Sequence, residues 1–122
     1  MQPPDEWSIV FYVEDTGASP VEEFLASVDP TTQRRFRWSI EQLRVRNVSA
    51  GMPLVRHLEG RLWELREESR TNIYRLIYFF FTGRQIVFLH GFQKKTQRTP
   101  SGEIETAQRR LRHFLEREGG ES

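Results

Sequence analysis

Two arginines inside apolar, strand-like segments are the residues of this sequence best suited to bind an anion. Arg75 lies in the segment Asn72 to Phe81, on a face that is otherwise apolar. Arg66 alternates with Leu62 and Glu64 in the preceding segment. A charge on such a face must be paired or must open to a cleft, because burying it alone is costly.

Two interpretations of Arg75 follow. In the first, it forms an ion pair with Glu64 or Glu67 on a neighbouring strand. In the second, Arg66 and Arg75 project into one concave surface, where the planar fork of each guanidinium suits a phosphate. The sequence alone leaves both interpretations open.

The stretch HGFQKKTQRTP places further cations directly after the last strand-like segment. Lys94, Lys95 and Arg98 follow one another within a few positions. A solvated turn is the simplest explanation of such a cluster. The alternative is that the two lysines join Arg66 and Arg75, which would bring four cations around one phosphate site.

The histidines are weaker candidates. His57, His90 and His113 lie on three separate segments, and no pair has the i, i+4 spacing of helical metal ligands. A structural or surface role is therefore preferred for each. His90 alone is close enough to the cationic segment to serve as an acid or base.

Several classes of chemistry are absent from the sequence. It contains no cysteine, which excludes thiol nucleophiles, disulfides and cysteine-based zinc sites. Paired carboxylates are not suggested, because the acids cluster in residues 1–30 and at positions 64, 67 and 68. No Gly-rich phosphate loop, Gly-x-Ser-x-Gly elbow or EF-hand pattern occurs. We therefore expect neither a metal ion nor another cofactor.

Aromatic residues gather in the segment that contains Arg75. They most simply build the core. Tyr74 could instead stack on a base, as in readers of single-stranded RNA. It lies on the opposite face from Arg75, so the two residues cannot serve one site without a bulge.

Charge is distributed unevenly along the 122 residues, although the net charge is only +1. Residues 1–30 contain seven acids and no lysine or arginine, whereas residues 31–60 contain six arginines against two glutamates. Residues 61–98 contain eight basic side chains against three acids. This basic middle indicates a phosphate-bearing partner.

The elements that must position these residues begin with a strand and two helices. Trp7 to Asp15 is rich in aromatic and β-branched residues, which predicts a strand. Ser19 to Glu22 has the form of a capping box, with Pro20 at the first helical position. Asp29-Pro30 repeats the start signal, and apolar residues then recur at helical spacing: Phe36, Ile40 and Leu43.

Three strands and a final helix follow. The strands are predicted over Leu62 to Glu68, Asn72 to Phe81 and Gln85 to Phe92, and a short turn with Gly83 joins the last two. Both faces of these two are apolar, which is typical of the centre of a sheet. Residues 101–118 then show a helical apolar stripe of Ile104, Ala107, Leu111, Phe114 and Leu115.

The order β-α-α-β-β-β-α predicts an α+β fold with a mainly antiparallel sheet. We expect one domain, residues 1–122, with 118–122 as a frayed tail. No apolar run reaches the length of a membrane span, and the first residues, MQPPDEW, do not resemble a secretory signal. The expected location is therefore the cytoplasm.

The segment from about residue 58 to residue 110 resembles the phage-derived, HigB-like branch of the RelE/ParE toxin superfamily. The motifs that carry the resemblance are ELR, YR and HGFQKKTQRTP, with EI and A beyond. The resemblance implies a RelE-like toxin of a type II toxin–antitoxin system. Such a toxin cleaves messenger RNA on the translating ribosome without a metal, and a partner antitoxin with a helix-turn-helix domain inhibits it.

The resemblance also implies roles for individual residues. Arg66 and Arg75 would bind the phosphate oxygens, and Lys94 would protonate the leaving group or stabilise its charge. Further contacts to RNA would come from four other side chains: Arg56, His90, Lys95 and Arg98. Glu64 stands where RelE has a lysine, and no counterpart of the tyrosine near the RelE C-terminus is evident, so the general base is not assigned.

Two alternatives belong to other functional classes. A ParE-like protein would inhibit DNA gyrase by binding and would need no nuclease site. A nonenzymatic module would use the basic groove only to receive a segment of a partner protein.

Overall fold

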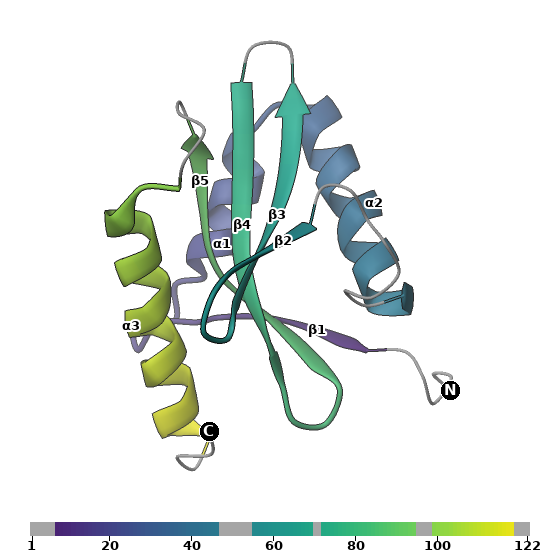
Figure 1. Ribbon diagram of the computed structural model, residues 1–122. Coiled ribbons are helices and arrows are strands. Elements are labelled where there is room, and N and C mark those ends of the chain that lie inside the picture. The colour runs from purple at the N-terminus through teal and green to yellow at the C-terminus, as the bar shows by residue number, and fades with distance from the viewer. Residues whose placement is uncertain (1–6, 47–54, 70–71, 95–98, 119–122) are drawn as a thin grey trace.

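The computed structural model describes residues 7–46, 55–69, 72–94 and 99–118, which form a five-stranded sheet with helices on both faces (Figure 1). The helices are α1 (Pro20–Ser27), α2 (Pro30–Arg46) and α3 (Ser101–Arg117). The strands are β1 (Ser8–Phe11), β2 (Val55–Glu59), β3 (Leu62–Ser69), β4 (Asn72–Phe81) and β5 (Gln85–Lys94). The predicted α+β class is confirmed. No helix in the described ranges is long and apolar enough to cross a membrane.

The strands lie in the order β1-β5-β4-β3-β2. Only β1 and β5 are parallel, and all other neighbours are antiparallel, so the predicted mainly antiparallel sheet is confirmed. β4 and β5 lie inside the sheet, as their two apolar faces predicted. The short turn at residues 82–84 joins them.

β2 is one strand more than the sequence predicted. Its side chains are exposed at Arg56, His57 and Glu59, so the segment shows no apolar alternation. The signal that marks it is Gly60, which has a φ of +52° in the turn to β3, a conformation that costs glycine little. As the edge strand of the sheet, β2 is stable with this polar sequence because much of its surface meets water.

Both predicted helix starts are confirmed, but only one carries a side-chain cap. At the start of α2, Asp29 accepts hydrogen bonds from the hydroxyl and the backbone N–H of Thr32, at 2.7 and 3.1 Å. These bonds hold the pKa of Asp29 below its ordinary value. Ser19, in the predicted capping box of α1, makes no side-chain cap bond. The helix starts there because Pro20 presets the backbone angle of the first turn.

Separate apolar cores lie on the two faces of the sheet. α1 and α2 cover one face and α3 covers the other (Figure 1). The predicted stripe of α3 packs on the sheet through Ala107, Leu111 and Phe114. Alternate side chains of β3 and β4, such as Leu65 and Leu76, pack beneath α1 and α2 instead. Parity along these strands therefore decides which layer a side chain enters.

Candidate active site

A β-bulge in β5 decides which lysine meets the strand arginines. In the register of β5 with β4, Leu89 is an extra residue between two paired positions. Val87 and Phe92 therefore both face the α3 core, although one position is odd and the other even. Strict alternation from Val87 would carry Lys95 to that side of the sheet. Because of the bulge, Lys94 takes this place instead.

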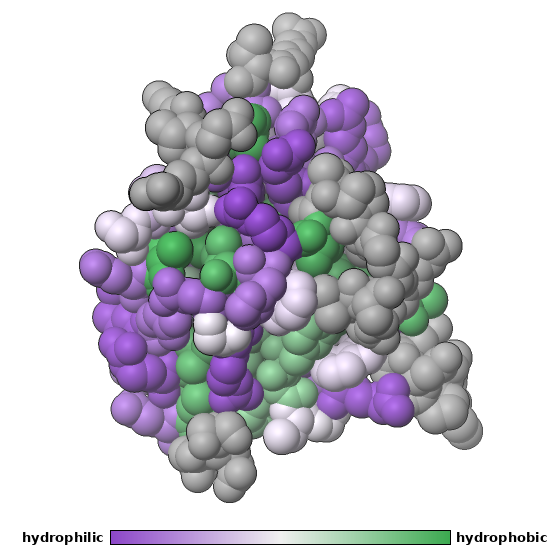
Figure 2. Space-filling model, viewed as in Figure 1, coloured by the Kyte–Doolittle hydropathy of each residue, from purple (hydrophilic) through white to green (hydrophobic). Residues whose placement is uncertain are grey.

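Arg66 of β3 and Arg75 of β4 lie directly opposite each other on the α3 side of the sheet. Lys94 is paired with Ile73, the next β4 residue on that side, so it lies diagonally beside Arg75. Figure 2 shows hydrophilic side chains gathered over this part of β3 and β4. Like charges directly opposite each other destabilise a sheet, so this cluster needs a counter-charge.

Glu64 supplies that counter-charge from within the sheet. Its side chain is 1% exposed. The carboxylate accepts hydrogen bonds from the guanidinium of Arg75, from Nη2 of Arg56 at 3.1 Å and from the hydroxyl of Thr99 at 2.6 Å. The ion pair of Arg75 with Glu64 is thus formed, on the same face as Arg66. The first of the two interpretations is therefore confirmed, and the binding of a phosphate by Arg66 and Arg75 stays a prediction.

Two guanidinium N–H groups in this cluster lack a partner. The Nε atoms of Arg66 and Arg75 are buried, and neither finds a hydrogen-bond acceptor within the described ranges. Buried polar atoms are nearly always hydrogen-bonded, so these two donors on directly opposite residues are available to an acceptor such as an oxyanion. Arg66 is the accessible member of the pair, because its side chain is 37% exposed beside its partner Glu68. Solvent, and an oxyanion dissolved in it, therefore reaches the Arg66 side chain.

Lys94 is the second deeply placed cation of the cluster, since only 3% of it is exposed. Burial lowers the pKa of its ammonium group to about 8, and repulsion by Arg75 adds to this effect. The nearby carboxylate of Glu64 opposes the shift. Lys94 therefore gives up its proton more readily than an ordinary lysine.

His90 lies on the same face but beneath α3. Its Nε2 is 2.5 Å from an oxygen of Glu103, and Nη1 of Arg110 lies 3.1 Å from its Nδ1. Because an arginine can only donate, Nδ1 must accept and Nε2 must carry the proton. Burial lowers the pKa of His90, which favours this neutral form. His90 thus ties β5 to α3, and its contact with RNA stays a prediction.

The other predicted contact residues are placed unequally. Arg56 belongs to the cluster through its bond to Glu64, whereas Lys95 and Arg98 lie outside the described residues. Tyr74 faces α1 and meets the ring of Phe24, as its parity predicted. Thr99 is a site residue that the sequence analysis missed. The available signal was its position directly before Pro100, the N-cap of α3, which fixes Thr99 close to the sheet.

Gly91 has a different role from the one that its place near a strand end indicates. β5 continues through Lys94, beyond the predicted end at Phe92. A β-carbon at Gly91 would lie 2.5 Å from the ring of Phe24 and 2.9 Å from Leu76. Glycine is therefore needed at this position because α1 packs so closely on β5.

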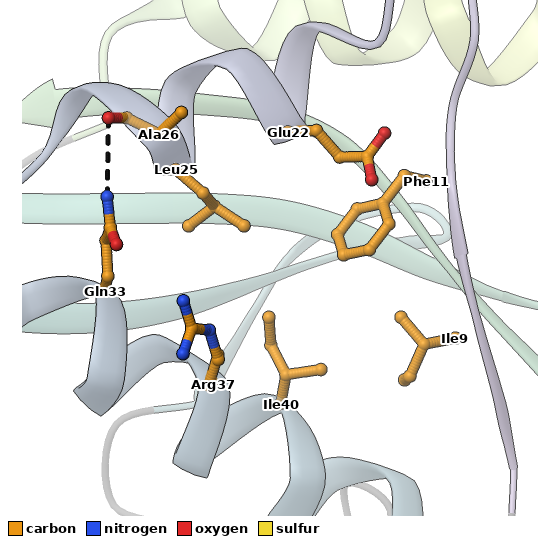
Figure 3. Close-up of a pocket in the computed structure, with 8 residues that line it drawn as sticks. All are labelled: Ile9, Phe11, Glu22, Leu25, Ala26, Gln33, Arg37 and Ile40. Carbon is orange, nitrogen blue, oxygen red and sulfur yellow. Dashed lines mark hydrogen bonds between the residues drawn. The ribbon is translucent and has the colours of Figure 1, made fainter.

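A groove lies away from this cluster, among α1, α2 and β1 (Figure 3). It measures about 530 Å³, and Ile9, Phe11, Leu25 and Ile40 form its apolar walls. Gln33 bridges the two helices by donating to the carbonyl of Ala26 at 3.3 Å. Arg37 and Glu22 are the charged residues of its lining. Its lining is suited to an apolar segment rather than to a phosphate.

The fold and this cluster define a small α+β protein that carries a partly buried cationic centre on one face of its sheet. Among the described residues, no group of three or more His, Asp or Glu side chains could hold a metal ion. A family model described as phage-derived protein Gp49-like (DUF891) matches residues 23–112, and the chain belongs to this family. The family is associated with toxins of the RelE/HigB type. No curated protein matches the chain.

Proposed function

We propose that this protein is the toxin of a type II toxin–antitoxin system, of the HigB-like branch, and that it cleaves messenger RNA on the ribosome in the cytoplasm. The observation that carries the proposal is the pair of buried, unpartnered Nε donors of Arg66 and Arg75, with Lys94 beside them. Family membership supports a toxin-like role in general. The chemistry rests on the geometry of the cluster.

The cluster is suited to a cleavage in which the RNA supplies its own nucleophile. The 2′-hydroxyl of a ribose attacks the adjacent phosphorus and loses its proton, and the 5′-oxygen of the next nucleotide leaves. The products are a 2′,3′-cyclic phosphate and a 5′-hydroxyl. Arg66 and Arg75 bind the phosphate oxygens, whose negative charge grows in the transition state.

Lys94 provides the proton for the leaving oxygen. A lysine with a pKa of about 8 gives up its proton more readily than an ordinary lysine, yet carries it at neutral pH. Glu64 holds Arg75 and Thr99 in place from behind and does not need to touch the RNA. The base that accepts the 2′-hydroxyl proton is left to the ribosome.

The experiment is induced expression of the wild-type chain and of Arg66→Ala, with growth and cleavage of translated transcripts as readouts. Arg66 is suited to this test because its side chain is more exposed than that of Arg75, so its removal disturbs the folded core less. We expect the wild type to arrest growth and to cut messages, and the variant to cut about 10²- to 10³-fold more slowly. Arg112→Ala, an exposed arginine on α3, serves as the matched control and should retain full activity.

Intact transcripts under wild-type expression would overturn the nuclease assignment. If supercoiling by gyrase failed in the same cells, the ParE-like alternative would replace it. The proposed partner is an antitoxin with a helix-turn-helix domain, which should co-purify with the toxin and restore growth when expressed with it.

A further inference from the structure

The outer face of α2 carries a tryptophan that the proposed cleavage does not use. Trp38 is 64% exposed, although large aromatic residues are usually buried for much of their surface. Arg34 and Arg35 precede it by four and three residues, so both lie beside the indole on the helix surface. An exposed aromatic ring between guanidinium groups is typical of surfaces that bind single-stranded nucleic acid.

The charge of this face favours an anionic partner. The sequence of α2 contains five arginines and a single acid, Glu41, which is paired with Arg44. Arg34 donates to the hydroxyl of Thr31 at 3.4 Å, and Arg35 donates to the backbone carbonyl of Glu68. Neither of these two arginines forms an ion pair with a carboxylate in the described part of the chain.

A hollow of about 380 Å³ accompanies the tryptophan. Its walls are Thr31, Arg34, Arg35, Trp38, Ser39 and Glu67. The one carboxylate among them, that of Glu67, is buried and accepts a hydrogen bond from Ser39 at 2.5 Å. Arg34 and Arg35 are exposed, so a partner that enters the hollow contacts positive charge at its surface.

This face and the candidate active site lie on opposite sides of the sheet, and the end of β3 links them. Arg35 binds the backbone of Glu68, and the carboxylate of Glu68 pairs with Arg66 at 2.9 Å. α2 also lies alongside β3 in Figure 1. A strand whose phosphate lies at Arg66 would pass around β3 at Glu68 to reach Trp38.

We propose that the outer face of α2 binds the single-stranded RNA that flanks the scissile phosphate, with a base stacked on Trp38 and phosphates bound by Arg34 and Arg35. This inference rests on the proposed function for the identity of the strand. Stacking accepts every base because each has an aromatic face, so this contact adds affinity without dictating sequence. The guanidinium forks suit the phosphates on either side.

The test measures binding of a fluorescently labelled oligonucleotide with 2′-O-methyl riboses, which the enzyme cannot cleave, by anisotropy. Trp38→Ala should weaken binding about tenfold, and Trp38→Phe should recover most of it because the ring is restored. Trp38→Leu, which is apolar but cannot stack, should resemble the alanine variant. Arg34→Ala should reduce the slope of log affinity against log salt by about 0.7, whereas Arg112→Ala should leave it unchanged.

The outcomes separate this inference from the proposed function. If Trp38→Ala binds as tightly as the wild type while the wild type cleaves messages, the α2 surface is wrong and the nuclease stands. If binding depends on Trp38 but no message is ever cut, the surface stands and the nuclease is wrong. If Trp38→Ala leaves RNA binding intact but abolishes capture of the antitoxin, α2 is a protein-docking face and the inference is overturned.

Discussion

Glu64 and Glu67 are buried carboxylates three residues apart on β3, and their surroundings differ because they face opposite sides of the sheet. Glu64 meets two arginines and a threonine hydroxyl on the α3 side. Glu67 meets the hydroxyl of Ser39 beneath α2. The first carboxylate balances a cluster in which cations remain in excess, whereas the second joins a helix to the sheet. An excess of positive charge around a buried acid is therefore the feature that separates the candidate site from the structural contact.

The largest difference between the two carboxylates should appear when Arg75, the ion-pair partner of Glu64, is removed. Arg75→Ala leaves a carboxylate that is 1% exposed without its closest cation, so we expect a loss of about 3 to 5 kcal/mol in the free energy of unfolding. Urea denaturation measures the loss. The double variant Arg75→Met with Glu64→Leu should recover part of it, because neither buried partner is then left charged without the other, although Arg56 also loses its bond to Glu64. Equal losses in the single and double variants would contradict this account.

Replacing Lys94, on the same face of the sheet, should raise the free energy of unfolding rather than lower it. Its folded-state pKa, about 8, lies below the ordinary value of 10.5, so burial of the charged form opposes folding. This destabilisation is fully present below pH 8 and disappears as the pH rises through 10.5, where the unfolded chain also loses the proton. We expect Lys94→Met to raise the free energy of unfolding at pH 7 by about 3 kcal/mol and to lower cleavage by about 10²- to 10³-fold.

The pH dependence provides the internal control for this variant. The stability difference between Lys94→Met and the wild type should shrink steadily between pH 8 and pH 10.5 in urea denaturation. A difference that stays constant over this range would show that packing, rather than the buried charge, is responsible. A stabilised but inactive variant would mark Lys94 as a residue kept for chemistry at the expense of stability.

The sequence predicted the layers better than it predicted the site. Alternation along β4 correctly separated Arg75 from Tyr74, because each face packs against its own helices. Alternation along β5 could not choose between Lys94 and Lys95, because the bulge at Leu89 depends on pairing with β4. A bulge is set by contacts between strands, and no local pattern marked it.

The contact between Glu64 and Thr99 could not be predicted from the sequence either, because the two residues are distant along the chain. They are separated by 35 residues, yet the Thr99 hydroxyl donates to the Glu64 carboxylate at 2.6 Å. Motif spacing within one segment carries no information about such a contact. The sequence offered an ion pair of Arg75 with Glu64 or Glu67 as one interpretation, and it could do so because register between adjacent strands limits the possible partners to a few residues.

The smallest expected effect concerns the structural carboxylate on the other face. Ser39→Ala removes a neutral hydroxyl from Glu67, so we expect a loss of about 1 to 2 kcal/mol in the free energy of unfolding. Ser8→Ala, an exposed serine of β1, is the control and should change stability by less than about 0.5 kcal/mol. Because the Ser39 bond involves no second charge, its loss should stay well below that of Arg75→Ala. Equal losses at the two sites would mean that charge balance does not distinguish the two faces of β3.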